Sequence, residues 1–392
     1  MQIHEITDLA QLAAIQKEWD ALLDESVTNS VYQSFEWLSV WWRHYARGQL
    51  WVLVAKSHGR VRCIAPLMLT RERVLGIPYR RIRFVGSDAT ETTTRNPFDR
   101  AFSIDRRYGW SDVLDFLYRP QDLEALRAVL AYLQRQRGRW DILDLRDFPA
   151  TTHSIALVEQ MLATQRPAAR ETAAQAAVVA LDTDMETYKK TRTKNWRKNI
   201  KRACNQIEGL TNVAVRTYQS PEQVAGMMPA VRELEARSWQ GQSGVGAFSE
   251  ERSAAFHHDV AVALAARDRF VLYTLEAADR LIAYQYALRD NERLHFHTTA
   301  MDPEFKPYSP GLYLQIKAIE QAFAEGLHEV VLGRGPETYK HKLKTGDQDR
   351  IWVTVFGTAP VPRLLASCEF GARPALRRMW LSARTAAQFC RG

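Results

Sequence analysis

Cysteine is scarce in this sequence, and its spacing matches no metal site. The chain of 392 residues has four cysteines, none of them in a CxxC pair, and its ten histidines form no HExxH motif. Such spacing argues against a disulfide framework or a structural zinc site. We therefore expect no metal ion and no permanently bound cofactor.

Long apolar runs and low-complexity stretches are also missing. No apolar run reaches the roughly 18–20 residues that a membrane span requires, and 19 glycines plus 15 prolines are too few for a low-complexity chain. The first twelve residues include two acids and lack a basic region followed by an apolar one, so we expect no signal peptide and a cytoplasmic protein. With 46% hydrophobic and 25% charged residues the composition is globular, and the length suggests two or three domains.

The excess of positive charge is confined to one short segment. Lysine and arginine number 53 and aspartate and glutamate 45, a difference of +8. Residues 189–202 contain eight cations and no acid, so the rest of the chain is balanced at 45 against 45. This pattern predicts a basic helix. It either binds an anionic partner, with Trp196 as a stacking surface, or is a solvated face with Trp196 docked in the core.

Hydrophobic patterning divides the chain into two α/β halves, separated by a stretch rich in Pro, Ala and Arg at 165–174. In the first half the pattern predicts helices at 9–23, 35–45 and 121–136, and strands at 2–7, 50–55, 61–69 and 140–145. In the second half it predicts a strand at 213–218, helices at 221–239 and 249–267, antiparallel strands at 270–275, 281–288 and 294–299, a helix at 313–325, and strands at 329–332 and 351–356. We predict domains at 1–168 and 169–360, followed by a basic helical segment at 361–392.

The two halves look like a degenerate internal repeat. Residues 50–69 and 270–288 each read as a strand, a polar turn ending in arginine, and a second strand. A chance likeness between two α/β hairpins is the alternative.

A turn between the strand at 294–299 and the following helix is the strongest candidate for a binding site. It reads Tyr308-Ser309-Pro310-Gly311, in which serine suits an N-cap and proline the first helical position. We expect the free N–H groups of Gly311, Leu312 and Tyr313 to point out of the helix, where its dipole favours anions. The strand after the helix should run parallel to the strand before it. An ordinary capped helix is the alternative.

A second candidate follows that parallel strand and borders the same edge of the sheet. The sequence Gly333-Arg334-Gly335-Pro336-Glu337-Thr338-Tyr339-Lys340 offers a carboxylate, a phenol and an ammonium group within one helical turn. Acyl transfer from a thioester needs a base for the nucleophile and an acid for the departing thiolate. A solvated polar helix is the alternative.

Two histidines, His295 and His297, alternate with neighbours on the strand at 294–299 and so share one face. They are candidates for the border of the acyl site, or they are structural. Weaker candidates for an acceptor pocket lie at the end of a helix before a glycine-rich loop: Glu233, Glu235, Arg237 and Trp239. Core and surface roles are the favoured alternative for most of them.

The order of elements from the basic helix onward resembles the GNAT acyltransferase fold. The two motifs around Pro310 and Tyr339 resemble the CelD/BioF-like GNAT acetyltransferases associated with cellulose and exopolysaccharide biosynthesis. Also similar are Ser34-Phe35-Glu36-Trp37, the Ile64-Ala65-Pro66-Leu67 strand and the stretch at 140–145. The resemblance implies a mixed-sheet α/β fold of tandem GNAT-like domains, in which the first is degenerate. The usual Arg/Gln-x-x-Gly-x-Gly/Ala signature is absent.

That resemblance implies acyl transfer from acetyl-CoA or another acyl-CoA to an amine or hydroxyl, with a saccharide precursor as the expected acceptor. Residues 308–313 would hold the diphosphate, and Tyr339 would protonate the thiolate. Glu337 would be the base, with His297 as its rival, and Lys340 would pair with a phosphate or the acceptor.

A likeness to the Fem aminoacyltransferases leaves a tRNA-dependent transferase as the rival enzyme, in which the basic helix would contact RNA. Otherwise no nucleic-acid partner is expected. An inactive scaffold in a polysaccharide-synthesis complex is the non-enzymatic alternative. The arginine-rich segment 361–391 either lies on an anionic membrane surface or packs on the domain.

Overall fold

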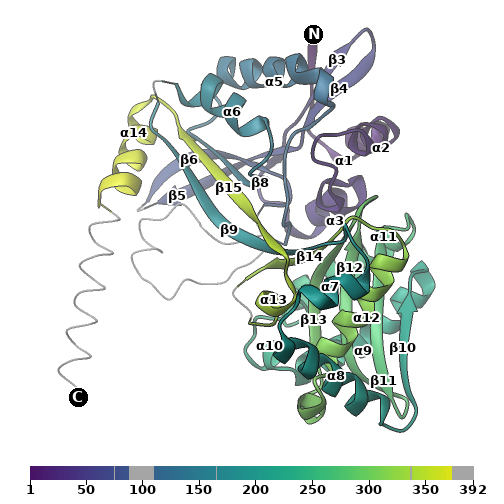
Figure 1. Cartoon of the computed structure of the whole chain (residues 1–392). Coiled ribbons are helices and arrows are strands. Elements are labelled where there is room, and N and C mark those ends of the chain that lie inside the picture. The colour runs from purple at the N-terminus through teal and green to yellow at the C-terminus, as the bar shows by residue number, and fades with distance from the viewer. Residues whose placement is uncertain (75, 88–109, 165, 336–337, 373–392) are drawn as a thin grey trace, which may run out of the picture. The chain divides into compact units, whose positions relative to one another are not determined.

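The computed structural model describes residues 1–74, 76–87, 110–164, 166–335 and 338–372 of the chain. It divides into two compact units (Figure 1). The first comprises residues 1–35, 45–173 and the chain from 350 onward, and the second comprises residues 36–44 and 174–349.

The first unit contains two sheets. One has the strand order β1-β3-β4-β7, and the other includes β15, β8, β6, β5 and β2 in that order. The strands are β1 (Gln2–Ile6), β2 (Gln49–Leu50), β3 (Val52–Ser57), β4 (Arg60–Ala65), β5 (Leu67–Val74), β6 (Ile77–Phe84), β7 (Leu117–Tyr118), β8 (Ile142–Pro149) and the end of β15 (Gly346–Phe356).

The helices that begin in this unit are α1 (Leu9–Ala14), α2 (Gln16–Asp24), α3 (Phe35–Tyr45), α5 (Leu123–Arg135), α6 (Ser154–Val158) and α14 (Pro360–Ser367). Among them, α2, α5 and α14 pack against its strands. Residues 36–44 of α3 belong to the second unit. In α14, Leu365 and Ala366 pack on Tyr79, Ile142 and Phe356, so the beginning of the basic C-terminal segment is packed on its domain. Residues 373–392, which carry most of its arginines, lie outside the described residues.

The second unit is built on one mixed sheet with the strand order β10-β11-β12-β13-β14-β9. Its strands are β9 (Ala168–Ala180), β10 (Val213–Tyr218), β11 (Phe270–Ala277), β12 (Arg280–Arg289), β13 (Arg293–Met301) and β14 (Glu329–Arg334). The pairs from β10 to β13 are antiparallel, and β13 and β14 are parallel, as predicted. The helices of this unit are α7 (Met185–Thr191), α8 (Lys194–Glu208), α9 (Pro221–Arg237), α10 (Trp239–Gln242), α11 (Glu251–Ala265), α12 (Pro310–Ala324) and α13 (Thr338–Leu343).

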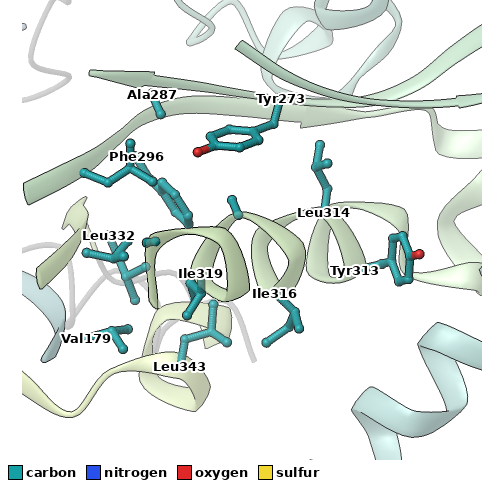
Figure 2. Close-up of a cluster of buried hydrophobic side chains, with 14 of the residues drawn as sticks. Val179, Tyr273, Ala287, Phe296, Tyr313, Leu314, Ile316, Ile319, Leu332 and Leu343 are labelled. Atoms are coloured by element: carbon teal, nitrogen blue, oxygen red, sulfur yellow. The ribbon is translucent and has the colours of Figure 1, made fainter. Parts of the chain in front are cut away.

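Alternate residues of this sheet face different helices. Tyr273, Ala287 and Phe296 belong to the same buried cluster as the apolar side of α12 (Figure 2). Residues of the opposite parity, Tyr284 and Tyr286, bond to groups on α9 and α11. Since successive side chains of a strand point to opposite faces, α12 lies on one face of the sheet and α9 and α11 on the other.

Two predictions about this half of the chain are wrong. The stretch predicted as a connection at 165–174 belongs largely to β9, which lies between β14 and β15 in the sheet. Since the pairing with β14 covers only residues 176–180, the neighbour of the earlier part of β9 is β15, and this pairing overrides the weak strand preference of its alanines. The basic segment forms two helices instead of one. The break falls where the Thr193 hydroxyl accepts the N–H of Trp196 at 3.2 Å and caps α8.

Within the described residues, no helix is long and apolar enough to cross a membrane.

Candidate active site

The parallel strands β13 and β14 separate partway along their length. Their pairing covers three residue pairs, of which the last is His295 with Val331. Immediately beyond it each strand has a register shift against its outer neighbour, at His297 in β13 and at Leu332 in β14. A bulge bends a strand and interrupts its ladder. The ladder between β13 and β14 therefore ends at this level, and beyond it their facing edges are not paired with each other; we call this unpaired stretch the opening.

The start of α12 follows β13 at the carboxyl ends of these strands. Pro310 is the first residue of the helix, and Ser309 occupies the N-cap position. Ser309 adopts the left-handed conformation, with φ 57°, and its side chain makes no capping hydrogen bond. Ser309 therefore occupies the predicted N-cap position, but its hydroxyl does not cap the helix by a hydrogen bond.

Two of the three N–H groups expected to be free are unbonded. The N–H of Tyr313 donates to the carbonyl of Ser309 at 3.1 Å, as the first hydrogen bond of the helix, so the expectation for Tyr313 is wrong. Among the described residues, the N–H groups of Gly311 and Leu312 have no acceptor. Both residues are half-exposed, and the helix dipole makes this a favourable place for an anion.

The large side chains of this corner pack against the core beneath α12. Tyr308 and Leu312 lie against the buried cluster that contains Tyr313. The hydroxyl of Tyr313 donates to Glu208 at 3.3 Å, and burial raises the pKa of Tyr313 to about 12. Figure 2 shows this side chain at the end of α12, away from Leu332 and Leu343. Tyr313 thus supports the corner and contributes no charge near neutral pH.

The loop after β14 holds the second motif. Gly333 and Gly335 have φ of 79° and 122°, which are backbone conformations that residues other than glycine rarely adopt. Lys340 is buried, and its ammonium group donates to the carbonyl of Arg334. This hydrogen bond ties Lys340 to the loop. Tyr339 is half-buried against the α12 cluster, and Glu337 lies outside the described residues.

The two histidines of β13 have different surroundings. His295 is buried, and its Nε2 lies 2.9 Å from Asp290 Oδ2. His297, the bulged residue, is half-exposed, and its Nε2 lies 3.2 Å from Nε2 of His257. The bulged residue His297 lies where β13 and β14 cease to pair, whereas His295 is the buried partner of Asp290.

A buried carboxylate organises the loop between α9 and α11. Oε2 of Glu235 accepts the hydroxyl of Tyr284 at 2.6 Å, and Oε1 accepts the N–H of Phe248 at 2.6 Å. A Cβ at Gly246 would lie 2.2 Å from Glu235 Oε1, and one at Gly241 would lie 2.2 Å from the Glu235 carbonyl. Burial raises the pKa of Glu235. We interpret Glu235 as the residue around which this loop is built, and the two glycines are the sequence signal for it.

One residue of this region, His257, was not singled out from the sequence. It is fully buried on α11, in contact with His297. A histidine on an amphipathic helix has no distinguishing pattern, so only the packing of α11 against β13 shows the pair.

Comparisons with known proteins agree with this architecture. The family profile described as "Acetyltransferase (GNAT) domain" matches residues 194–341, a region that includes β13, α12 and β14. A comparison of the sequence with curated proteins finds no significant match. The matched region, residues 194–341, lies within the second unit and is similar to GNAT acetyltransferase domains.

Solved structures show the same fold over nearly the whole chain. FemX superposes with a TM-score of 0.62 at 10% identity, covering 93% of this chain and 100% of that chain. A conserved protein of unknown function from Bacteroides thetaiotaomicron gives 0.54 at 13% identity, covering 91% and 100%. The C-terminal DUF2156 domain of a protein from Agrobacterium fabrum, described as a lysylphosphatidylglycerol synthetase, gives 0.54 at 11% identity, covering 90% and 94%. The predicted fold class, a mixed α/β fold of the tandem GNAT type, is confirmed.

Proposed function

We propose that the second unit transfers an acyl group from acyl-CoA to an amine or hydroxyl group of an acceptor. The observation that carries this proposal is the opening between β13 and β14 with the start of α12 at its carboxyl end. The match of residues 194–341 to the GNAT acetyltransferase domain supports it, because such domains use acyl-CoA as a co-substrate.

Each part of acyl-CoA has a counterpart in this region. The amides of the pantetheine arm would pair with the facing strand edges of β13 and β14, which do not pair with each other beyond His295. The diphosphate would accept the N–H groups of Gly311 and Leu312, with Tyr308 and Ser309 beside it. Tyr313 would brace this corner through its side chain.

The chemistry would take place in a ternary complex, with no covalent intermediate on the protein. The acceptor attacks the thioester carbonyl, Tyr339 protonates the departing thiolate, and His297 takes the acceptor's proton. Glu337 is the alternative base. Lys340 would act by holding the loop that carries Tyr339, since its ammonium group is bonded within that loop.

For the acceptor we propose a saccharide precursor of a cell-surface polysaccharide. The support is the likeness of the Tyr308–Gly311 and Gly333–Lys340 motifs to the CelD/BioF-like acetyltransferases. Such a substrate would place the protein in the cytoplasm, in contact with a membrane-bound synthase.

Thermal denaturation with acetyl-CoA tests the binding corner. Ligand at 100 times its Kd stabilises a protein by about 2.7 kcal/mol, so a rise in Tm is expected for the wild type. Gly311→Asp should abolish the rise, because it places a carboxylate beside the phosphates. A Cβ at Gly311 would make only ordinary contacts with Met301, at 3.7 Å, so Gly311→Ala is the matched control and should keep most of the shift. A wild type that ignores millimolar acyl-CoA would refute the assignment of the donor.

A second candidate donor is aminoacyl-tRNA, and the exposed face of α8 favours it. Trp196 and Ile200 turn into the core, so Trp196 is no stacking platform. The outer face of α8 presents Lys194, Arg197, Lys198, Lys201 and Arg202. Within the described part of the chain none of these five cations forms an ion pair, and an RNA backbone would supply the missing anions.

Gel-shift titration with bulk tRNA tests this second candidate. If α8 contacts phosphates, the affinity falls steeply with salt, and the double variant Lys198→Glu, Lys201→Glu weakens binding and flattens the salt slope by about two. Lys17→Glu, at an exposed site in the first unit, is the control and should bind as the wild type does. An unchanged slope in the double variant would exclude α8 as the contact surface.

A further inference from the structure

Two histidine side chains meet inside the second unit, one from α11 and one from the bulge of β13. Nε2 of His257 lies 3.2 Å from Nε2 of His297, and the ring centroids are 5.3 Å apart. A hydrogen bond between two imidazoles requires a proton on one of these nitrogens and a lone pair on the other. The position of that proton decides which atom of His297 is able to act as a base.

The surroundings of His257 fix the answer. Its Nδ1 lies 2.7 Å from the carbonyl oxygen of Ser253, which only accepts hydrogen bonds, so Nδ1 carries a proton. His257 is fully buried, and burial together with the nearby His297 lowers the pKa of His257 well below its ordinary value. A neutral His257 protonated on Nδ1 has its lone pair on Nε2. It therefore accepts the Nε2–H of His297, and the lone pair of a neutral His297 lies on Nδ1.

Aromatic neighbours hold both rings in this arrangement. The hydroxyl of Tyr286 donates to the His257 carbonyl at 3.0 Å, and its ring lies 5.6 Å from that of His297. Trp37 stands edge-on to His297 at 5.4 Å, and Phe256 stands edge-on to Trp37 at 5.3 Å. Rotation of either imidazole would have to displace this packing, so the hydrogen-bond direction is built into the fold.

A shared metal ion is the other reason for two imidazole nitrogens to approach this closely. Protein metal sites take three or more ligands from His, Cys, Asp and Glu. Within the described residues no cluster of three such groups is placed to hold a metal ion. The close approach of the two Nε2 atoms is therefore explained by a hydrogen bond between them.

We propose that His257 is a positioning residue that holds His297 in the tautomer protonated on Nε2, so that Nδ1 receives the acceptor's proton during acyl transfer. This inference rests on the proposed function. The acceptor's nitrogen or oxygen bonds to the thioester carbonyl carbon, its proton passes to His297 Nδ1, and the carbon–sulfur bond breaks. The thiolate takes a proton from Tyr339, and transfer through solvent from the His297 imidazolium to the Tyr339 phenolate restores both residues.

The hydrogen bond to His257 also persists when His297 takes up the acceptor's proton. In the imidazolium the Nε2–H to His257 bond is charge-assisted and stronger than the neutral one. The neutral imidazole of His257 thus plays the part that a carboxylate plays in the hydrolase triads, where the carboxylate fixes the tautomer of the histidine and orients its ring.

Long-range 1H–15N correlation on full-length protein labelled with 15N-histidine tests the tautomer without any substrate. The expected spectrum has His297 protonated on Nε2 and unprotonated on Nδ1, with the signals assigned by their loss in His297→Gln. A His297 protonated on Nδ1, or an averaged mixture of tautomers, would overturn the proposal. This measurement does not depend on the donor or the acceptor.

Steady-state kinetics test the role. His257→Phe removes the nitrogen that accepts the Nε2–H of His297. It should lower kcat by about 10–100-fold, the usual range for a lost supporting hydrogen bond, with KM for acyl-CoA unchanged. His257→Gln places a side-chain carbonyl near the position of Nε2 and should restore most of kcat, which a purely space-filling role would not predict. His258→Phe, at the exposed neighbour, is the control.

The outcomes separate the two ideas. Normal turnover by a folded His257→Phe variant would remove His257 from the reaction while leaving the acyl transfer intact. A wild type with the expected tautomer but no acyl-CoA turnover would instead refute the proposed function.

Discussion

The two units contain the same strand arrangement, but it ends differently in each. The order β1-β3-β4-β7 in the first unit matches β10-β11-β12-β13 in the second, with an antiparallel hairpin at the centre of each. The last strand has two residues in β7 and nine in β13. Within the described residues, β7 is the last strand of its sheet beside β4, whereas β13 continues the sheet to the parallel strand β14. The hairpin that makes the halves look repeated is therefore a shared scaffold, and the two units differ at the fourth strand.

Buried charge also distinguishes the units. The first unit buries ion pairs in which Arg81 bonds to Glu72 and Asp144 between β5, β6 and β8. Around the candidate site, the second unit buries His257 and Glu235, which are bonded to uncharged partners. Charged pairs hold together a sheet that has no proposed chemistry, whereas neutral hydrogen bonds orient the groups beside the opening.

The largest expected effect is on the stability of the first unit. Arg81→Met would leave the carboxylates of Glu72 and Asp144 without this buried partner, and breaking a buried ion pair costs about 3–5 kcal/mol. Arg62→Met is the control, since Arg62 is partly exposed and 3.5 Å from Asp122, and it should cost less than about 1 kcal/mol. Urea denaturation measures both. Equal losses would show that burial of the Arg81 ion pairs adds nothing to the stability of the first unit.

The next effect concerns turnover. Tyr339→Phe removes the proposed acid and should lower kcat by about 100-fold, the low end for general acid catalysis, with KM for acyl-CoA nearly unchanged. Tyr132→Phe, which removes a hydroxyl bonded to Glu5 in the first unit, should leave kcat unchanged. If Tyr132→Phe were as damaging as Tyr339→Phe, the chemistry would not belong to the second unit alone.

The smallest effect is a difference in pH dependence. Burial raises the pKa of Asp115 in the first unit to about 6, so the protonated form is favoured in the folded state. The stability that protonated Asp115 contributes is lost as the pH rises through 6. Acidification from pH 7 to pH 5 should therefore raise the free energy of unfolding of the first unit by about 1 kcal/mol. His257 has a lowered pKa, so the second unit should lose stability over the same acidification.

Hydrogen exchange, corrected for its intrinsic pH dependence, resolves the two units separately. Asp115→Asn should remove the gain in the first unit, and His257→Gln the loss in the second. Parallel slopes in the two units would contradict the assignment.

Local patterns predicted most of the fold. The helix at 35–45 and the strand at 213–218 have the predicted bounds, because their apolar spacing agrees with the burial that the fold imposes. The strand β9 was missed because alanines and polar residues carry little strand preference of their own, and because its neighbours in the sheet, β14 and β15, are distant in the sequence. The break before α8 was readable in principle, since threonine at 193 is a good N-cap residue.

The candidate site was predicted less completely, for a related reason. The turn at Ser309–Gly311 and its place at the start of a parallel crossover follow from short-range sequence, and both are present. The burial of Lys340 and the contact between His257 and His297 depend on how separate elements pack, and neither has a period or a spacing in the chain. Sequence patterns located the corner, while the partners of its charged and titratable groups needed the three-dimensional structure.

The bulge at His297 amounts to one surplus residue in β13. Loss of that residue would make the ladder with β12 continuous, because Phe296 and Thr298 already pair with the neighbouring residues Ala287 and Tyr286. Every later residue of β13 would keep its partner and its face, whereas the bend beside β14 and the imidazole that meets His257 would be lost together. A single-codon deletion is therefore enough to convert this half of the protein from a site-bearing sheet into a plain one.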